Sequence, residues 1–309
     1  MHGLMQDHPL LISSLIRHAA ANHGRREVVS RLGDGSIHRS DYAAIERRAR
    51  RLAQTLERQG IRPGDRIATL AWNSYRHLEC FYGVSGMGAV LHTVNPRLFH
   101  EQIAYIIRHA EDRVLIFDAD LLPIVEKIAP EISCVERFVV LTDRAGVPAS
   151  DSLDLVAYED WMAAAGDDYA WPEFDERAAS SLCYTSGTTG NPKGVLYSHR
   201  STLIHAFSVG QADSFALSSL DTVMPIAPLF HANGWSLPYA CPMVGAKMVL
   251  PGNRMDAASL LELIVGECVS FAVGVPTIWT MLLAYMAEQG VTLTALDRCL
   301  VAGTALPPA

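Results

Sequence analysis

One short stretch gathers hydroxyl side chains, glycines and a single lysine, since residues 184–194 read "YTSGTTGNPKG". Glycine lets backbone N–H groups approach an anion closely, while hydroxyls and a lysine can donate hydrogen bonds to its oxygen atoms. This combination favours the binding of a polyphosphate. The alternative is a purely structural glycine-rich turn.

Two common phosphate-binding motifs do not fit this loop. A Walker A loop needs glycine directly before its lysine and serine or threonine directly after it. Here Pro192 precedes Lys193, and Gly194 follows it. Gly187 and Gly190 also do not complete the G-x-G-x-x-G pattern of a dinucleotide-binding fold. The loop therefore belongs to another class of phosphate-binding site.

The same loop resembles the signature of the adenylate-forming superfamily, which contains acyl-CoA synthetases, luciferases and the adenylation domains of peptide synthetases. Other landmarks of that superfamily are similar in sequence and order, namely "GAVLHTVNPRL" (88–98), "PIAPLFHANGW" (225–235), "GVPTIW" (274–279) and "LVAGTALP" (300–307). Within the superfamily, residues 9–20, 94–99 and 231–252 are most similar to bacterial medium- and long-chain fatty-acid–CoA ligases.

The resemblance implies an enzyme that uses ATP and Mg²⁺ to convert a medium- or long-chain fatty acid to acyl-AMP. Coenzyme A is then the second substrate, and acyl-CoA the product. An aromatic or short-chain acid–CoA ligase is the alternative within the enzyme class. A non-catalytic module that binds nucleotide weakly is the alternative outside it.

Nucleotide-binding residues follow from the resemblance. The residues implied around the triphosphate are Thr185, Ser186, Gly187, Thr188, Thr189, Gly190 and Lys193, with Thr185 as the magnesium contact. Those implied beside the adenine are Ala302, Gly303, Thr304 and Ala305. Lys193 and His231 are the candidate catalytic residues.

The resemblance also implies residues that bind the acid. His231 stands where amino-acid-activating relatives carry an aspartate, which disfavours an amino-acid substrate; the alternative is a histidine merely packed between loop and core. Trp235 would border and gate an acyl tunnel, or else be an ordinary core tryptophan. The residues implied to line the acyl pocket are Gly274, Val275, Pro276 and Thr277.

The elements that position these residues can be predicted from periodicity. Apolar residues between 42 and 56 recur at three- and four-residue steps, with Ser40 or Asp41 as the helix cap and Gly60 at the end. Helices are also expected at 75–85, 101–110, 257–268 and from 201, and strands at 66–72, 89–94, 113–117, 179–186, 222–228, 246–250, 269–275 and 299–303. This alternation predicts an α/β fold of mostly parallel sheets layered with helices.

One long stretch of the chain lacks the alternating helix and strand patterns and indicates how the chain is divided. Residues 142–177 are polar and acidic and contain Pro148 and Pro172, so a subdomain boundary is expected there. Relatives continue past the position of Ala309 through further magnesium- and ribose-binding motifs to a small C-terminal domain with a catalytic lysine. We therefore expect residues 1–309 to be a partial N-terminal AMP-binding domain, incomplete at its C-terminus, with that lysine domain absent. Alone, it should form neither acyl-AMP nor acyl-CoA at a useful rate.

Composition and charge limit the partners, metals and cellular locations that the sequence allows. The 309-residue chain has a formal charge of −8, which argues against a nucleic-acid partner. Its six cysteines lack paired spacing, so buried free thiols and no structural metal are expected. Neither a signal peptide nor a membrane-spanning segment is recognisable, which predicts a cytoplasmic location. By resemblance, residues 9–17 are a candidate contact of a homodimer.

Overall fold

The computed structural model describes residue 1, residues 3–185 and residues 191–304. Within these residues the strands form two sheets, of seven and six strands. The seven-stranded sheet has the spatial order β7, β6, β5, β3, β4, β8, β9. Its strands are β3 (Arg66–Leu70), β4 (Val90–Thr93), β5 (Asp112–Phe117), β6 (Arg137–Val140), β7 (Leu155–Ala157), β8 (Ala179–Thr185) and β9 (Lys193–Ser198). Neighbouring strands are parallel except that β9 is antiparallel to β8.

The six-stranded sheet has the order β13, β12, β10, β11, β1, β2. Its strands are β1 (Glu27–Arg31), β2 (Ile37–Asp41), β10 (Thr222–Pro225), β11 (Lys247–Leu250), β12 (Phe271–Gly274) and β13 (Arg298–Val301). These strands are also parallel, apart from the edge strand β2, which is antiparallel to β1. The predicted α/β fold of mostly parallel sheets is confirmed.

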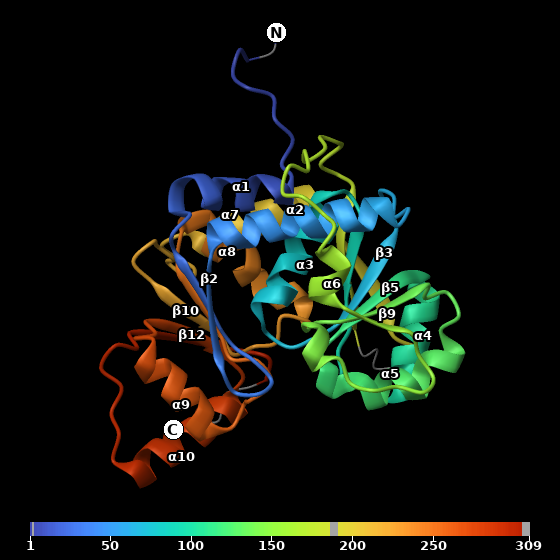
Figure 1. Cartoon of the computed structure of the whole chain (residues 1–309). Coiled ribbons are helices and arrows are strands. Elements are labelled where there is room, and N and C mark those ends of the chain that lie inside the picture. The colour runs from blue at the N-terminus through green and yellow to red at the C-terminus, as the bar shows by residue number, and fades with distance from the viewer. Residues whose placement is uncertain (2, 186–190, 305–309) are drawn as a thin grey trace.

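Helices cover both faces of each sheet (Figure 1). The helices between the sheets are α1 (Ile12–His23), α2 (Tyr42–Arg58), α3 (Tyr75–Gly86), α7 (His199–Gly210) and α8 (Leu237–Val244), and their apolar side chains share one core with both sheets. Helices α4 (His100–Ala110) and α5 (Leu122–Ile128) pack on the outer face of the seven-stranded sheet. Helices α9 (Ala257–Gly266) and α10 (Pro276–Gln289) pack on the outer face of the other sheet. The architecture is therefore layered.

Helix α2 illustrates how local sequence builds these elements. Asp41 caps it by accepting a hydrogen bond from the Ala44 N–H at 2.7 Å. Its apolar residues Ile45, Ala49 and Leu52 lie on one face and are fully buried. The helix predicted from the spacing of these residues is thus confirmed.

Residues 142–177 contribute β7 and the short helix α6 (Tyr158–Met162), and β7 pairs with β6 in the seven-stranded sheet; the boundary there stays a prediction. The expectation of buried thiols is wrong for Cys268 and Cys299, which are exposed in loop and edge positions. In the described part of the chain, every helix is too short or too polar to cross a membrane.

Candidate functional site

The predicted phosphate loop connects β8 to β9. The two strands form a hairpin in which Thr185 lies opposite Lys193. Both side chains are exposed, and the Thr185 hydroxyl lies 3.5 Å from the Lys193 carbonyl oxygen, a long contact. Ser186, Gly187, Thr188, Thr189 and Gly190 lie outside the described residues. The hairpin thus presents one hydroxyl and one ammonium group where the loop begins and ends.

Tyr184 anchors the base of this hairpin. Its hydroxyl lies 2.6 Å from His109 Nδ1 on α4, and burial raises its pKa to about 12. Gly194 lies opposite Tyr184, and a Cβ there would come within 3.1 Å of both the Tyr184 ring and Leu182. Close packing against the tyrosine therefore explains the glycine that follows Lys193.

Asn73 joins the two sheets near the carboxyl end of β3. Its side-chain amide donates to the carbonyl oxygens of Pro225 and Ala227, at 2.7 and 3.1 Å. Its side-chain oxygen accepts from the Leu229 N–H at 2.8 Å. Because Asn73 is buried, with 3% of its surface exposed, these bonds are shielded from water. They hold the segment that leads from β10 to His231.

His231 itself is exposed. The carbonyl oxygen of the preceding Phe230 accepts a hydrogen bond from Thr93, at the end of β4, at 3.1 Å. Thr93 lies beside Cys183 on β8, two residues before Thr185. A continuous set of contacts therefore connects the base of the phosphate loop to His231.

The next five residues, Ala232–Ser236, form what we call the left-handed segment. Their φ angles are 41° at Ala232, 45° at Asn233, 70° at Gly234, 53° at Trp235 and 65° at Ser236. Residues other than glycine rarely adopt this conformation, because Cβ crowds the following carbonyl oxygen. A Cβ at Gly234 would lie 2.9 Å from Pro238 and 3.0 Å from Leu229. Strained backbone of this kind is found more often at functional sites than elsewhere.

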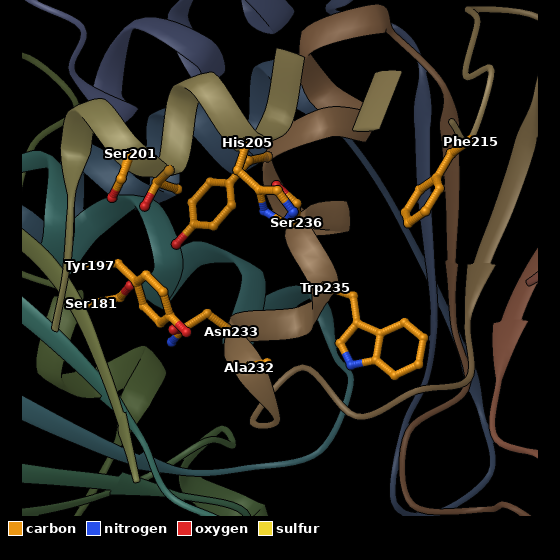
Figure 2. A pocket seen from close by; sticks show the side chains of 11 residues that line it. Ser181, Tyr197, Ser201, His205, Phe215, Ala232, Asn233, Trp235 and Ser236 are labelled. Atoms are coloured by element: carbon orange, nitrogen blue, oxygen red, sulfur yellow. The ribbon is translucent and has the colours of Figure 1, made fainter. Parts of the chain in front are cut away.

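A cavity of about 510 Å³ lies between the left-handed segment, β8, β9, α7 and α8. Its lining residues are Ser181, Tyr197, Ser201, Thr202, His205, Phe215, Ala232, Asn233, Trp235, Ser236 and Tyr239. In Figure 2, Trp235 and Phe215 lie on one side of it, and Ser181 and Tyr197 lie on the opposite side. Its volume is typical of a pocket for a small organic ligand. Trp235 lines this cavity, is half-buried and also packs against the central core, and its role stays a prediction.

The acyl-pocket and adenine segments lie side by side. Gly274 at the end of β12 pairs with Val301 at the end of β13, and the Ala302 N–H donates to the Gly274 carbonyl at 3.4 Å. Gly303 has a φ of 98°, and a Cβ there would come within 3.1 Å of Val275. A glycine is therefore required where these two segments meet.

The remaining residues of these two segments differ in exposure. Pro276 is buried at the start of α10, whereas Thr277 and Thr304 are exposed. Ala305 lies outside the described residues. The acyl-pocket segment also neighbours the chain before His231, because the N–H groups of Ile226 and Ala227 donate to the Val273 carbonyl. The structure therefore places 274–277 and 302–304 at the ends of the neighbouring strands β12 and β13, with the start of the segment that leads to His231 beside them, while the roles of these residues stay predictions.

Several residues of the site were not predicted. Asn73 follows directly after a strand in "IATLAWNSY", and a polar residue at the carboxyl end of a parallel strand is a signal that could have found it. Asn233 lies inside a recognised landmark without a role assigned to it. Ser181 and Tyr239 carry no such signal, because only the packing of β8 against α8 makes them neighbours of one cavity.

Comparison with known proteins agrees with this geometry. The sequence profile of a family described as AMP-binding enzyme matches residues 16–309. The chain belongs to this family. The AMP-binding family assignment confirms the resemblance to adenylate-forming enzymes, because the match covers nearly all of the chain and includes every segment of the site.

Two curated relatives, which are CoA ligases named for different acids, are similar to this chain. The chain is 50% identical over 307 residues to a medium-chain-fatty-acid–CoA ligase of Ectopseudomonas oleovorans, covering 99% of this chain and 56% of the relative. It is 51% identical over 308 residues to a 3-methylmercaptopropionyl-CoA ligase of Ruegeria pomeroyi, covering 100% of this chain and 57% of the relative. The chain thus spans little more than half the length of these relatives.

Among solved structures, the fold is similar to that of an anthranilate CoA ligase crystallised with anthranoyl-AMP. The TM-score is 0.85 at 24% identity, covering 98% of this chain and 57% of that one. This similarity confirms that the two layered sheets have the fold found in an AMP-binding enzyme.

Proposed function

We propose that the protein activates a medium- or long-chain fatty acid with ATP and transfers the acyl group to coenzyme A. The observation that carries the proposal is the cavity beside the left-handed segment, which is bordered by Trp235 and Phe215 and lies next to the strand that ends at Thr185. Membership of the AMP-binding family and the medium-chain relative support the same function. The acid would enter the cavity tail first, with its carboxylate near His231.

In the first step, a carboxylate oxygen attacks the α-phosphorus of ATP. The bond between the α-phosphorus and the bridging oxygen breaks, and pyrophosphate leaves. Negative charge builds up on the phosphate oxygens, so donors already held in place accelerate the step. Lys193 and Thr185, which lie opposite each other at the two ends of the loop, would supply an ammonium group and a hydroxyl. His231 would position the carboxylate.

In the second step, the sulfur of coenzyme A attacks the acyl carbon. The bond from that carbon to the AMP oxygen breaks, AMP leaves, and the thiol proton passes to solvent. The acyl-AMP must be shielded from water until the thiol arrives. Gly303 would allow the backbone to lie close to a planar adenine, because it has no Cβ.

Magnesium would reach this site together with ATP. Thr185 is exposed, so a cation can reach its hydroxyl, which we propose as the magnesium contact. Across residues 1, 3–185 and 191–304, no group of three His, Cys, Asp or Glu side chains is arranged to hold a metal. This donor set fits Mg²⁺, which keeps several water molecules and binds mainly through substrate phosphates. When bound, the ion would neutralise charge on those phosphates.

A shorter acid is the second candidate substrate. The relative from Ruegeria pomeroyi is named for 3-methylmercaptopropionate, an acid with a short thioether tail, and is as similar to this chain as the medium-chain ligase. The proposed chemistry is the same for both acids, since the carboxylate reacts and the tail only binds.

ATP–pyrophosphate exchange tests the proposal. The protein expressed from its own gene is incubated with ATP, Mg²⁺ and labelled pyrophosphate, without acid or with octanoate, hexadecanoate, 3-methylmercaptopropionate or a benzoate. We expect exchange that depends on octanoate or hexadecanoate. Exchange with 3-methylmercaptopropionate alone would select the second candidate. Nucleotide binding without exchange for any acid would contradict both and indicate a non-catalytic module.

A further inference from the structure

The hydroxyl of Thr93, the last residue of β4, makes two hydrogen bonds to the chain around His231. It donates to the Phe230 carbonyl oxygen at 3.1 Å and accepts from the Asn233 side-chain amide at 3.2 Å. Phe230 directly precedes His231 in the sequence, and Asn233 follows it two residues later. One hydroxyl therefore acts both as donor and as acceptor, and it holds the chain on both sides of a candidate site residue.

Both hydrogen bonds are shielded from water. Thr93 has 2% of its surface exposed and Asn233 has 5%. A valine at position 93 would keep the shape of the side chain but leave the Phe230 carbonyl and the Asn233 amide without this partner. A buried polar group that loses its partner is costly, because little water can reach it as a replacement. The chain around His231 would therefore shift to recover hydrogen bonds.

Thr93 belongs to the sheet that carries the phosphate loop. It lies opposite Cys183 on β8, and β8 ends two residues later at Thr185. His231, in contrast, follows β10 of the six-stranded sheet. The Thr93 hydroxyl thus connects the sheet proposed to hold ATP with the segment proposed to hold the carboxylate of the acid.

Asn73 holds the earlier part of the same segment. Its side chain makes the three hydrogen bonds described above to residues 225–229. It follows β3, which is the neighbour of β4 in the seven-stranded sheet. Two neighbouring strands of one sheet therefore hold successive parts of the segment, and Thr93 is the anchor nearer to His231.

The conformation that Thr93 holds is a strained one. Asn233 has φ and ψ angles of 45° and 45°, and Ala232 has a φ of 41°. Strained backbone persists only where the surrounding contacts over-determine it. The bond from Asn233 to Thr93 is such a contact, and it comes from outside the left-handed segment. Its removal would let the segment relax, and the adjoining His231 would move with it.

We infer that Thr93 is a positioning residue, which sets the place of the carboxylate relative to the triphosphate through its hold on both sides of His231. This inference rests on the proposed acid-activating function and adds a residue to it. Attack on the α-phosphorus requires the carboxylate oxygen to lie in line with the departing pyrophosphate. A misplacement of about 1 Å can slow such a reaction about a hundredfold.

Thr93→Val tests the inference, because it removes the hydroxyl and keeps the branching of the side chain. The protein from its own gene and the variant are assayed by ATP–pyrophosphate exchange with the acid that gives the fastest exchange in the unaltered protein. We expect kcat to fall at least about tenfold, while the KM for ATP changes by less than about twofold. Thr93→Ser keeps the hydroxyl and should restore most of the lost kcat.

Thr69→Val is the matched control. Thr69 pairs with Thr93 on the neighbouring strand β3 and is also buried. Its hydroxyl, however, lies 3.0 Å from Nε2 of His77 on α3. Both valine variants should lower the free energy of unfolding in urea, since each loses a buried hydrogen bond. Only Thr93→Val should lower kcat.

The outcomes separate this inference from the proposed function. An unchanged kcat in Thr93→Val would overturn the inference, and so would an equal fall in Thr69→Val, which would indicate a general effect of lost stability. A higher KM for ATP with an unchanged kcat would also overturn it, because Thr93 would then act on the phosphate loop. In each of these cases, acid-dependent exchange by the unaltered protein would still support the proposed function. If no acid supports exchange in the unaltered protein, the proposed function fails and this inference with it.

Discussion

Two substitutions in the left-handed segment should change stability in opposite directions. Ala232 has a φ of 41° and is exposed, so its methyl group adds backbone strain but little packing. Gly234, two residues later, has a φ of 70° and no room for a Cβ beside Pro238 and Leu229. Ala232→Gly should therefore stabilise the protein, and Gly234→Ala should destabilise it.

The size of each change in the free energy of unfolding can be worked out from backbone strain, chain entropy and packing. A residue with a Cβ loses about 1 to 2 kcal/mol in the left-handed conformation, and glycine loses about 0.5 to 1 kcal/mol more chain entropy than alanine on folding. Ala232→Gly should then raise the free energy of unfolding by about 0.5 to 1 kcal/mol. For Gly234→Ala, the same strain adds to overpacking of about 1 to 3 kcal/mol, while the entropy difference of about 0.5 to 1 kcal/mol now favours alanine, so a loss of about 1 to 4.5 kcal/mol is expected.

Urea unfolding followed by circular dichroism and tryptophan fluorescence measures both changes. Ala163→Gly is a suitable control, because Ala163 is also exposed but has an ordinary φ of −59°. There only the entropy cost applies, so the control should be destabilised by about 0.5 to 1 kcal/mol. The reasoning is refuted if Ala232→Gly is destabilised as much as Ala163→Gly.

Three further predictions concern the candidate site and its support. Lys193→Ala and Thr185→Ala should each slow acyl-AMP formation by the equivalent of about 1.5 to 3 kcal/mol, measured as pyrophosphate release, and unchanged release in both would exclude the loop as the triphosphate site. Trp235→Ala should change the KM or the chain-length profile for the acid and leave ATP affinity nearly intact; altered thermal stability with unchanged kinetics would instead mark a core residue. Burial lowers the pKa of His199 from 6.5 to about 4, and its Nδ1 accepts from the Ile12 N–H at 3.1 Å. Because the unfolded chain takes up the proton first, the stability present above pH 6.5 is lost as the pH falls towards 4, by about 3 kcal/mol at the lower end. His199→Asn keeps an acceptor for Ile12 and should flatten this pH dependence in urea titrations, with the exposed His18→Asn as control; an unchanged slope in His199→Asn would contradict the assignment.

Much of the fold could be predicted because its signals are local. The spacing of Ile45, Ala49 and Leu52 together with the cap at Asp41 predicted α2, and short apolar runs predicted the strands from β3 to β5. The edge strand β2 was missed, since its residues are half-exposed and show no apolar run. The assignment of strands to two sheets was missed as well, because β1 pairs with β11 across 220 residues of sequence, from Val28 to Met248.

The candidate site, like the fold, could be predicted from the sequence only where its signals are local. The chemistry offered by Thr185 and Lys193 can be stated from residue types and spacing alone, because hydroxyls, an ammonium group and adjacent glycines act within one loop. The lining of the cavity could not be predicted in this way. Serine and tyrosine at 181 and 239 are unremarkable in the sequence, and they line the same cavity only because distant segments of the chain pack together. Local sequence is sufficient for propensity, capping and loop chemistry, whereas burial and the loss of hydrogen-bond partners depend on contacts between distant segments and are decided by the tertiary structure.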